Sequence, residues 1–122
     1  MRHVQIVNHD HPLPTPLQAV YCDTFACRLR GLMFRSQLER EAGLLLVENR
    51  DSRMDTAIHM LFVFMDLAVI WISSEGVIVD RVLARAWHPA YAPRLPARYI
   101  LEVHHERLAD FSPGDRIEFR DA

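Results

Sequence analysis

The longest apolar stretch of the chain runs from Ala57 to Ile72, and only His59 and Asp66 interrupt it. As a helix, this stretch would be about 24 Å long, which is short of the roughly 30 Å hydrocarbon core of a bilayer. Asp66 near its middle would cost about 2.5 kcal/mol or more there, which disfavours a membrane span. The many Val, Ile and aromatic residues favour extended backbone instead. Because strands usually have about five or six residues, we expect two strands, near 57–64 and 67–73, with a bend at Asp66 between them.

Further strands are predicted along the chain, separated by turns. Ser-Ser-Glu-Gly at 73–76 is typical of a turn, after which the next strand would run back beside 67–73. The uninterrupted apolar run at 43–48 predicts a central strand, and the short apolar run at 4–7 predicts an edge strand. Turn residues at 112–115 precede a half-buried strand near the end. The further predicted strands are 4–7, 43–48, 77–87, 98–104 and 116–120.

Apolar and polar residues alternate in the strand predicted at 98–104. Tyr99 and Leu101 should therefore face the core, while Glu102 and His104 should lie on a wetter face.

One helix is predicted, starting after Asp23 or Thr24, either of which can cap it. Its apolar residues Phe25, Leu29, Leu32 and Met33 have helical spacing and should share one buried face. A Pro-rich loop is expected at 88–97. The whole pattern predicts a mainly β (or α+β) fold, an antiparallel β-sandwich or partly closed barrel with one or two short helices.

Composition bounds the chain further. The 122 residues fit a single domain, 1–122, and the formal net charge of −2 gives no basic field, so we expect no nucleic-acid partner. All 14 basic residues are Arg, which suits carboxylate or phosphate recognition, although compositional drift in a genome that favours Arg codons is the preferred explanation.

Two cysteines, Cys22 and Cys27, are too few for a disulfide framework or a four-cysteine zinc site. If both lay on one helix, they would be roughly 140° apart and would not pair. We therefore expect a small core residue or a free thiol at each position. With no secretory signal pattern at the start, this predicts a cytoplasmic protein with reduced thiols and no membrane association.

Arg-Leu-Arg-Gly-Leu-Met-Phe-Arg-Ser-Gln-Leu at 28–38 resembles the Arg-x-x-Gly-Leu-Met-x-Arg-x-x-Leu signature of the family called domain of unknown function 192. Later blocks follow in the family's order, so the resemblance covers a core of about 20–120. It implies a compact, mainly β fold with a helix near its start, and it implies no established activity, substrate or cofactor. This chain departs from the family pattern at Asp66, where the family's acid has moved or been lost, and at His104 and His105.

Seven histidines raise the question of a metal site. His9 with His11, and Glu102 with His104, have the spacing that places two ligands on one face of a strand. Because the familiar zinc spacings are absent, we expect solvated surface at both places and predict no metal site.

His59 and Asp66 lie in apolar surroundings. We expect His59 to be a core histidine with one ring nitrogen bonded to the backbone. Asp66 should cap turn amides, pair with an Arg or reach water in a cleft. Arg28 and Arg35 are two helical turns apart, so they should share a face, forming either surface ion pairs or an anion site near Tyr99 or His59.

We favour a non-catalytic accessory domain that binds a small polar or anionic ligand or a protein partner, as a monomer or homodimer. The alternative is a small metal-dependent or acid-base enzyme using His59, Glu102 and His104, which requires these side chains to converge. The ligand-binding candidates are Arg28, Arg35, His59, Asp66, Tyr99, Glu102 and His104; the cofactor is unknown.

Overall fold

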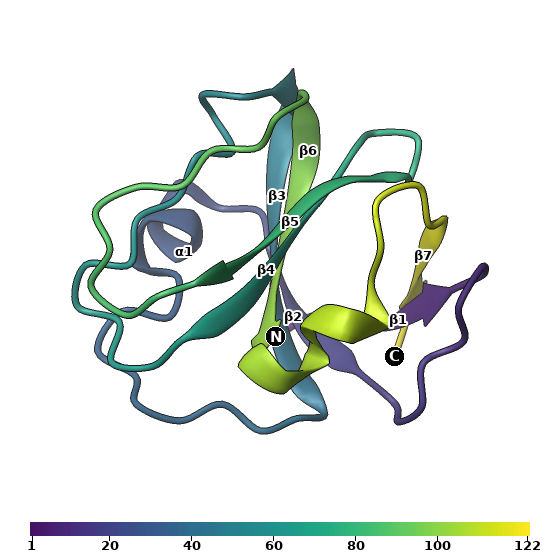
Figure 1. Cartoon of the computed structure of the whole chain (residues 1–122), viewed down its shortest axis with the longest axis horizontal. Helices are drawn as coiled ribbons and strands as arrows, with labels where there is room; N and C mark the ends of the chain where they lie inside the picture. The colour runs from purple at the N-terminus through teal and green to yellow at the C-terminus, as the bar shows by residue number, and fades with distance from the viewer.

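The computed structural model describes all 122 residues. Figure 1 shows that the strands form one curled sheet. The chain also has two short helices. The strands follow the order β5-β4-β6-β3-β2-β1-β7, and all neighbours are antiparallel except β2 and β3, which are parallel. The predicted mainly β fold is confirmed. The strands are β1 (His3–Asn8), β2 (Gln18–Cys22), β3 (Ala42–Ser52), β4 (Leu67–Ile72), β5 (Ile78–Ala84), β6 (Ala97–His104) and β7 (Ile117–Asp121); the helices are α1 (Phe25–Arg30) and η1 (His105–Asp110).

The two ends of the sheet meet at one corner, so the sheet forms a partly closed barrel. Val77 and Arg116 form an isolated bridge there, and the Ile117 N–H donates to the Gly76 carbonyl at 2.7 Å. Gly76 has φ of 82°, and a Cβ on it would lie 2.8 Å from the Ile117 carbonyl oxygen. Only glycine fits this corner without displacing backbone.

Each face of the sheet carries its own core. The inner face is buried by side chains such as Ile70, Leu101 and Phe111. The outer face, which includes Trp71 and Ile100, is covered by α1 and by the irregular segments 31–41, 53–66 and 85–96. No helix of the protein is both long and apolar enough to cross a bilayer.

Most predicted strands are confirmed, including 67–73, its pairing with 77–87, and the central strand at 43–48. The strand at 4–7 exists as β1, but it lies between β2 and β7 and is not an edge strand. The strand predicted at 57–64 is wrong. That segment is irregular and makes a single bridge, from Ile58 to Tyr91, because its apolar side chains cover the outer core without joining the sheet. Strand β2 was not predicted.

Helix α1 begins where predicted, since the Thr24 hydroxyl oxygen accepts from the Cys27 N–H at 3.2 Å. It ends at Arg30, earlier than the pattern indicated, because Gly31 follows with φ of 49°. The predicted buried face is therefore wrong in part: Phe25 and Leu29 are 73% and 61% exposed, and only Leu32, beyond the helix, is buried.

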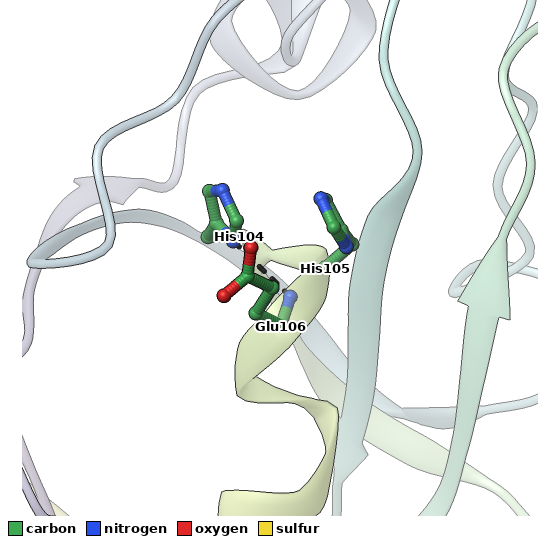
Figure 2. A group of neighbouring side chains, drawn as sticks. All are labelled: His104, His105 and Glu106. Atoms are coloured by element: carbon green, nitrogen blue, oxygen red, sulfur yellow. Dashed lines mark hydrogen bonds between the residues drawn. The ribbon is translucent and has the colours of Figure 1, made fainter.

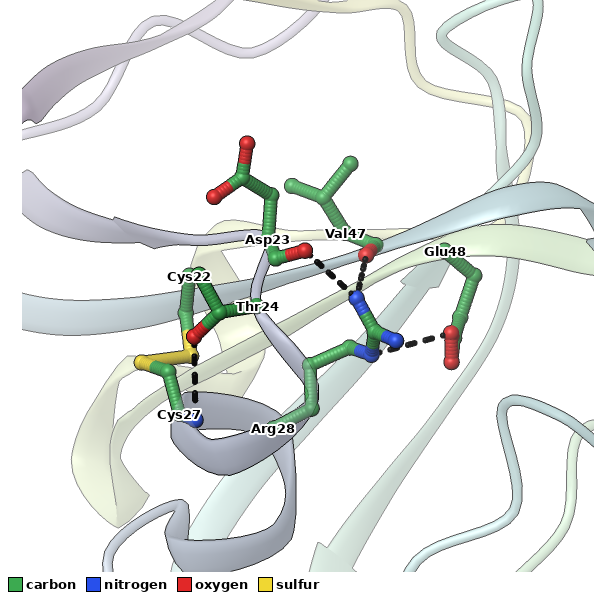
Figure 3. Close-up of a disulfide and its surroundings, with 7 residues drawn as sticks. All are labelled: Cys22, Asp23, Thr24, Cys27, Arg28, Val47 and Glu48. Atoms are coloured by element: carbon green, nitrogen blue, oxygen red, sulfur yellow. Dashed lines mark hydrogen bonds and ion pairs between the residues drawn. A yellow bond between two sulfur atoms is a disulfide. The ribbon is translucent and has the colours of Figure 1, made fainter.

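A disulfide joins Cys22 and Cys27, so the expectation of two unpaired cysteines is wrong (Figure 3). Cys22 is the last residue of β2 and only Cys27 lies on α1, so the one-helix geometry does not apply. Their Cα atoms are 5.6 Å apart, within bonding reach. The bond ties the start of α1 to the sheet.

We predict that the Cys22→Ala/Cys27→Ala double variant is less stable than the oxidised wild type, because the bond restricts the unfolded chain. The loop that it closes is very short, so the loss of stability should be only about 2 kcal/mol. Urea unfolding monitored by circular dichroism measures the difference. Wild type reduced with dithiothreitol is the matched control, since it lacks the bond but keeps both side chains. Equal stability of oxidised and reduced wild type would contradict the prediction.

Candidate functional site

A pocket of about 260 Å³ lies between α1 and the outer face of the sheet; we call it the α1 pocket. Strands β3 and β6 form its floor, α1 and the residues after it form one wall, and the segment 55–59 forms the other. It is lined by Phe25, Arg28, Leu29, Arg30, Gly31, Leu32, Met33, Leu46, Glu48, Asp55, Ala57, Ile58, His59, Ile100 and Glu102.

Glu102 is the unusual residue of this floor. It is only 6% exposed, and its neighbours across the sheet are Leu44 on β3 and Val69 on β4. Its side chain has no hydrogen-bond or ion-pair partner in the protein, so burial raises its pKa to about 7. The expectation that Glu102 lies on a wetter face is wrong, because α1 and its flanking segments cover that face. A carboxyl group that changes protonation near neutral pH therefore lies at the floor of the pocket.

Gly31 leaves space above this carboxyl group. A Cβ on Gly31 would lie 3.9 Å from the Glu102 Oε1 atom, at ordinary van der Waals distance, so a side chain there would narrow the space above the carboxyl group.

Arg28 lines the same pocket, but its charge is already balanced (Figure 3). Its Nε lies 3.2 Å from Glu48 Oε2, and its Nη1 donates to the carbonyls of Asp23 and Val47 at 2.7 and 3.2 Å. The predicted shared helical face with Arg35 is wrong, since α1 ends before Arg35. Arg28 therefore supports the wall of the pocket more than it offers a free cation.

His59 lies at the rim of the pocket and is exposed, so the predicted core histidine is wrong. The apolar stretch around it is a covering loop whose outward positions meet solvent. Sequence reasoning missed Glu48 and Asp55, which also line the pocket. The spacing of Glu48 after an apolar strand was the available signal for the first of these.

Asp66 and His104 lie elsewhere, in a second hollow that His105 also lines. Asp66 accepts from the Ala86 N–H at 2.9 Å and from Arg85 Nη1 at 3.0 Å, as expected for a residue that caps backbone and pairs with an Arg. The Ala86 N–H, followed by Arg85, holds the pKa of Asp66 below its usual range. Its hydrogen-bonding capacity is thus used within the protein.

His104, His105 and Glu106 place potential metal-ligand atoms within 4.8 Å of one another (Figure 2). His104 Nδ1 already accepts from the Glu106 N–H at 3.1 Å, and Glu106 pairs with Arg40. Partial burial, followed by the neighbouring His105, lowers the pKa of His104. Two of the three groups are therefore engaged, which makes a poor metal centre.

The remaining candidates lie outside both hollows. Tyr99 packs on the inner face against Phe119, with ring centroids 4.9 Å apart, and Arg35 lies on the exposed segment after α1. His9 and His11 bind different carboxylates, Glu118 and Asp115. Of the predicted site residues, the α1 pocket brings together Arg28, His59 and Glu102 only.

The sequence and the fold of this chain match a known class of proteins. The family model of domain of unknown function 192, described as "Uncharacterized ACR", matches residues 5–119. The chain belongs to this family.

Among relatives, the UPF0127 protein of Thermococcus gammatolerans is 38% identical over 99 residues, which are 80% of this chain and 63% of that protein. The UPF0127 protein PF1050 of Pyrococcus furiosus is 30% identical over 105 residues, covering 84% and 87% of the two chains. This chain thus spans less than two thirds of the length of the first relative.

Two solved structures share the fold. A protein from Sinorhizobium meliloti, described as a candidate transcription regulator, has a TM-score of 0.80 at 23% identity, covering 97% of this chain and 92% of that one. A protein of unknown function from Novosphingobium aromaticivorans has a TM-score of 0.77 at 20% identity, covering 95% and 83%. At these identities the likeness shows the fold alone.

Glu102 should make the stability of the protein depend on pH. Its pKa is about 7 in the folded chain, against an ordinary value of 4.5, so the folded state holds the proton more tightly. The stability should therefore fall as pH rises from about 4.5 to about 7, by about 3 kcal/mol in total. Urea unfolding across this range measures the effect, and the Glu102→Gln variant should lack it.

Glu75→Gln is the control, because Glu75 is exposed in the turn before β5 and should leave the pH profile unchanged. If the free energy of unfolding changed with pH in the same way in wild type and Glu102→Gln, this would contradict the buried position of the carboxyl group.

Proposed function

We propose that this chain is a ligand-binding domain and that the α1 pocket is its binding site. The observation that supports this most directly is Glu102, a buried carboxyl without a partner that faces a pocket. Such a group costs folding free energy, because it loses most of its hydration and gains no hydrogen bond in exchange. No side-chain polar atom of the protein is both fully enclosed and without a partner, so the Glu102 oxygens remain accessible. A perturbed carboxyl in a concave, partly apolar site is a typical mark of a functional group.

The pocket suits a small polar ligand with an apolar body and a hydrogen-bond donor. Leu46 and Ile100 on the floor offer apolar contact, and Glu102 between the strands offers the acceptor. A ligand amine would hold Glu102 in its ionised form, since an adjacent cation favours the carboxylate. An anionic ligand fits less well, because Arg28 is bound to Glu48.

An acid-base enzyme is the second candidate function. A carboxyl with a pKa of about 7 suits general acid or base catalysis, and His59 lines the same pocket. His104 lies in the other hollow, so this alternative would use Glu102 and His59 without it.

The cytoplasmic location, the absence of nucleic-acid and membrane partners, and the monomeric or homodimeric state remain predictions. The Cys22–Cys27 bond bears on the location, because cytoplasmic thiols are kept reduced. Equilibration of the protein with glutathione buffers would tell whether the bond persists at a cytoplasmic redox poise.

The ligand class is tested with three probes of one shape: benzylamine, benzyl alcohol and benzoate, each at millimolar concentration. We expect benzylamine to raise the melting temperature most, because binding to the folded state alone stabilises it. Its effect should grow between about pH 6 and pH 8, as Glu102 ionises. Differential scanning fluorimetry measures the shifts.

The Glu102→Leu variant should lose the benzylamine effect, whereas Glu75→Gln, at an exposed position outside the pocket, should keep it. An equal response to benzoate, or an undiminished response in Glu102→Leu, would refute the proposed ligand class.

A further inference from the structure

Four aromatic side chains form an exposed group on the covering loops; we call Phe34, Phe62, Phe64 and Trp87 the aromatic cluster. Each is between 43% and 65% exposed. Phe62 contacts Phe34 and Trp87, with ring centroids 5.5 and 5.0 Å apart, and Phe64 contacts Trp87 at 5.6 Å. The rings thus form one continuous apolar surface, which the ligand proposed for the α1 pocket does not use.

Backbone hydrogen bonds hold the three segments of this cluster together. The Phe34 N–H donates to the Phe62 carbonyl at 2.7 Å, and the Phe64 N–H donates to the Arg35 carbonyl at 3.1 Å. The Trp87 N–H donates to the Met60 carbonyl at 2.9 Å. The rings therefore project from a cross-linked framework and not from free loops.

The backbone of the cluster is also strained. The three non-glycine residues with positive φ in this protein are Phe34, Phe62 and Trp87, at 65°, 61° and 66°. Bulky residues rarely adopt this conformation, since Cβ approaches the following carbonyl oxygen. Strain of this kind is found where a structure holds side chains in place for binding. Exposed rings on strained backbone add little to the core, so folding alone does not account for them.

The one charge beside the cluster that has no partner of opposite sign is positive. The segments that carry the rings, 32–36, 58–65 and 85–88, contain Arg35 and Arg85 and no acidic residue. Arg35 has no carboxylate partner, and its Nη2 meets only the Gln37 carbonyl at 3.5 Å. Arg85 already pairs with Asp66, whose Oδ2 lies 3.0 Å from its Nη1, so Arg35 is the free cation. A partner for this surface should therefore bring carboxylates as well as apolar side chains.

We propose that the aromatic cluster is a docking surface for a polypeptide segment that combines apolar and acidic side chains. Trp, Phe and Arg are enriched at the centres of protein interfaces, where they supply most of the binding energy. The locked backbone suits a polypeptide partner, because its side chains can match one fixed arrangement of rings in shape, whereas a fluid lipid surface has no fixed shape to match. The docking surface is separate from the α1 pocket and does not depend on ligand binding there.

The strain in the cluster can be tested by itself. Glycine tolerates positive φ and alanine does not, so Phe62→Gly should melt higher than Phe62→Ala, by about 3 °C. The neighbouring Leu61 is not among the residues with positive φ, so there the order should reverse, with Leu61→Gly melting lower than Leu61→Ala. The same order at both positions would show that the cluster is not held as described and would overturn the fixed docking surface.

Docking is tested by selecting a displayed library of random peptides on the wild-type protein. The Phe62→Gly/Trp87→Ala variant serves for counter-selection, after circular dichroism has shown that it folds. We expect enriched peptides to carry net negative charge next to apolar residues. A synthetic copy should shift the indole N–H signal of Trp87 and leave that of Trp71, which is buried and bound to the Thr56 carbonyl, in place.

The Arg35→Glu variant should bind the enriched peptide at least tenfold more weakly, whereas Leu95→Ala, at an exposed position outside the cluster, should bind it unchanged. Enrichment of basic or uncharged peptides, or no enrichment over the counter-selected variant, would overturn the proposal. The proposal would also be overturned if the protein sedimented with phosphatidylglycerol vesicles and bound no peptide, because the surface would then be assigned to lipid. A dimer that Trp87→Ala dissociates would assign it instead to a second copy of the chain.

Discussion

The pairing of β6 with both β3 and β4 is the constraint on which the rest of the structure depends. Because β6 lies inside the sheet, its alternate side chains supply both cores: Leu101 and Val103 on the inner face, Ile100 on the outer. The same register places Glu102 between two apolar neighbours and beneath α1. A carboxyl group in that position has no hydrogen-bond partner within the sheet. Its protonation state therefore depends on the groups or molecules that occupy the α1 pocket.

The sequence predicts the sheet well and its covering poorly. Long apolar or alternating runs identify β3 to β7 because a strand buried in a sheet needs that pattern on its own faces. The segment 57–64 has the same composition for a different reason, since it lies over the outer core, and composition does not distinguish the two. No local signal shows that Phe34, Phe62 and Trp87 have positive φ, which tertiary hydrogen bonds impose.

The candidate site was predictable in its residue types and not in their grouping. Arg28, His59 and Glu102 were recognisable as chemically capable, but their convergence depends on where α1 ends and how the loop at 55–59 crosses β6. The pairing of Arg28 with Arg35 failed for the same reason, since a helix that stops at Arg30 shares no face with residues beyond its end. The disulfide was not predicted because β2 was not predicted, so nothing placed Cys22 relative to Cys27 on the helix.

One feature of the topology bears on how such pockets diversify. Strands β2 and β3 are the parallel pair of this sheet, and a parallel pair cannot be joined by a tight hairpin, so residues 23–41 must cross over one face. Figure 1 shows α1 within this crossover. Insertions or deletions there would reshape the cavity while leaving the strand register intact, so the shape of the pocket can change independently of its scaffold.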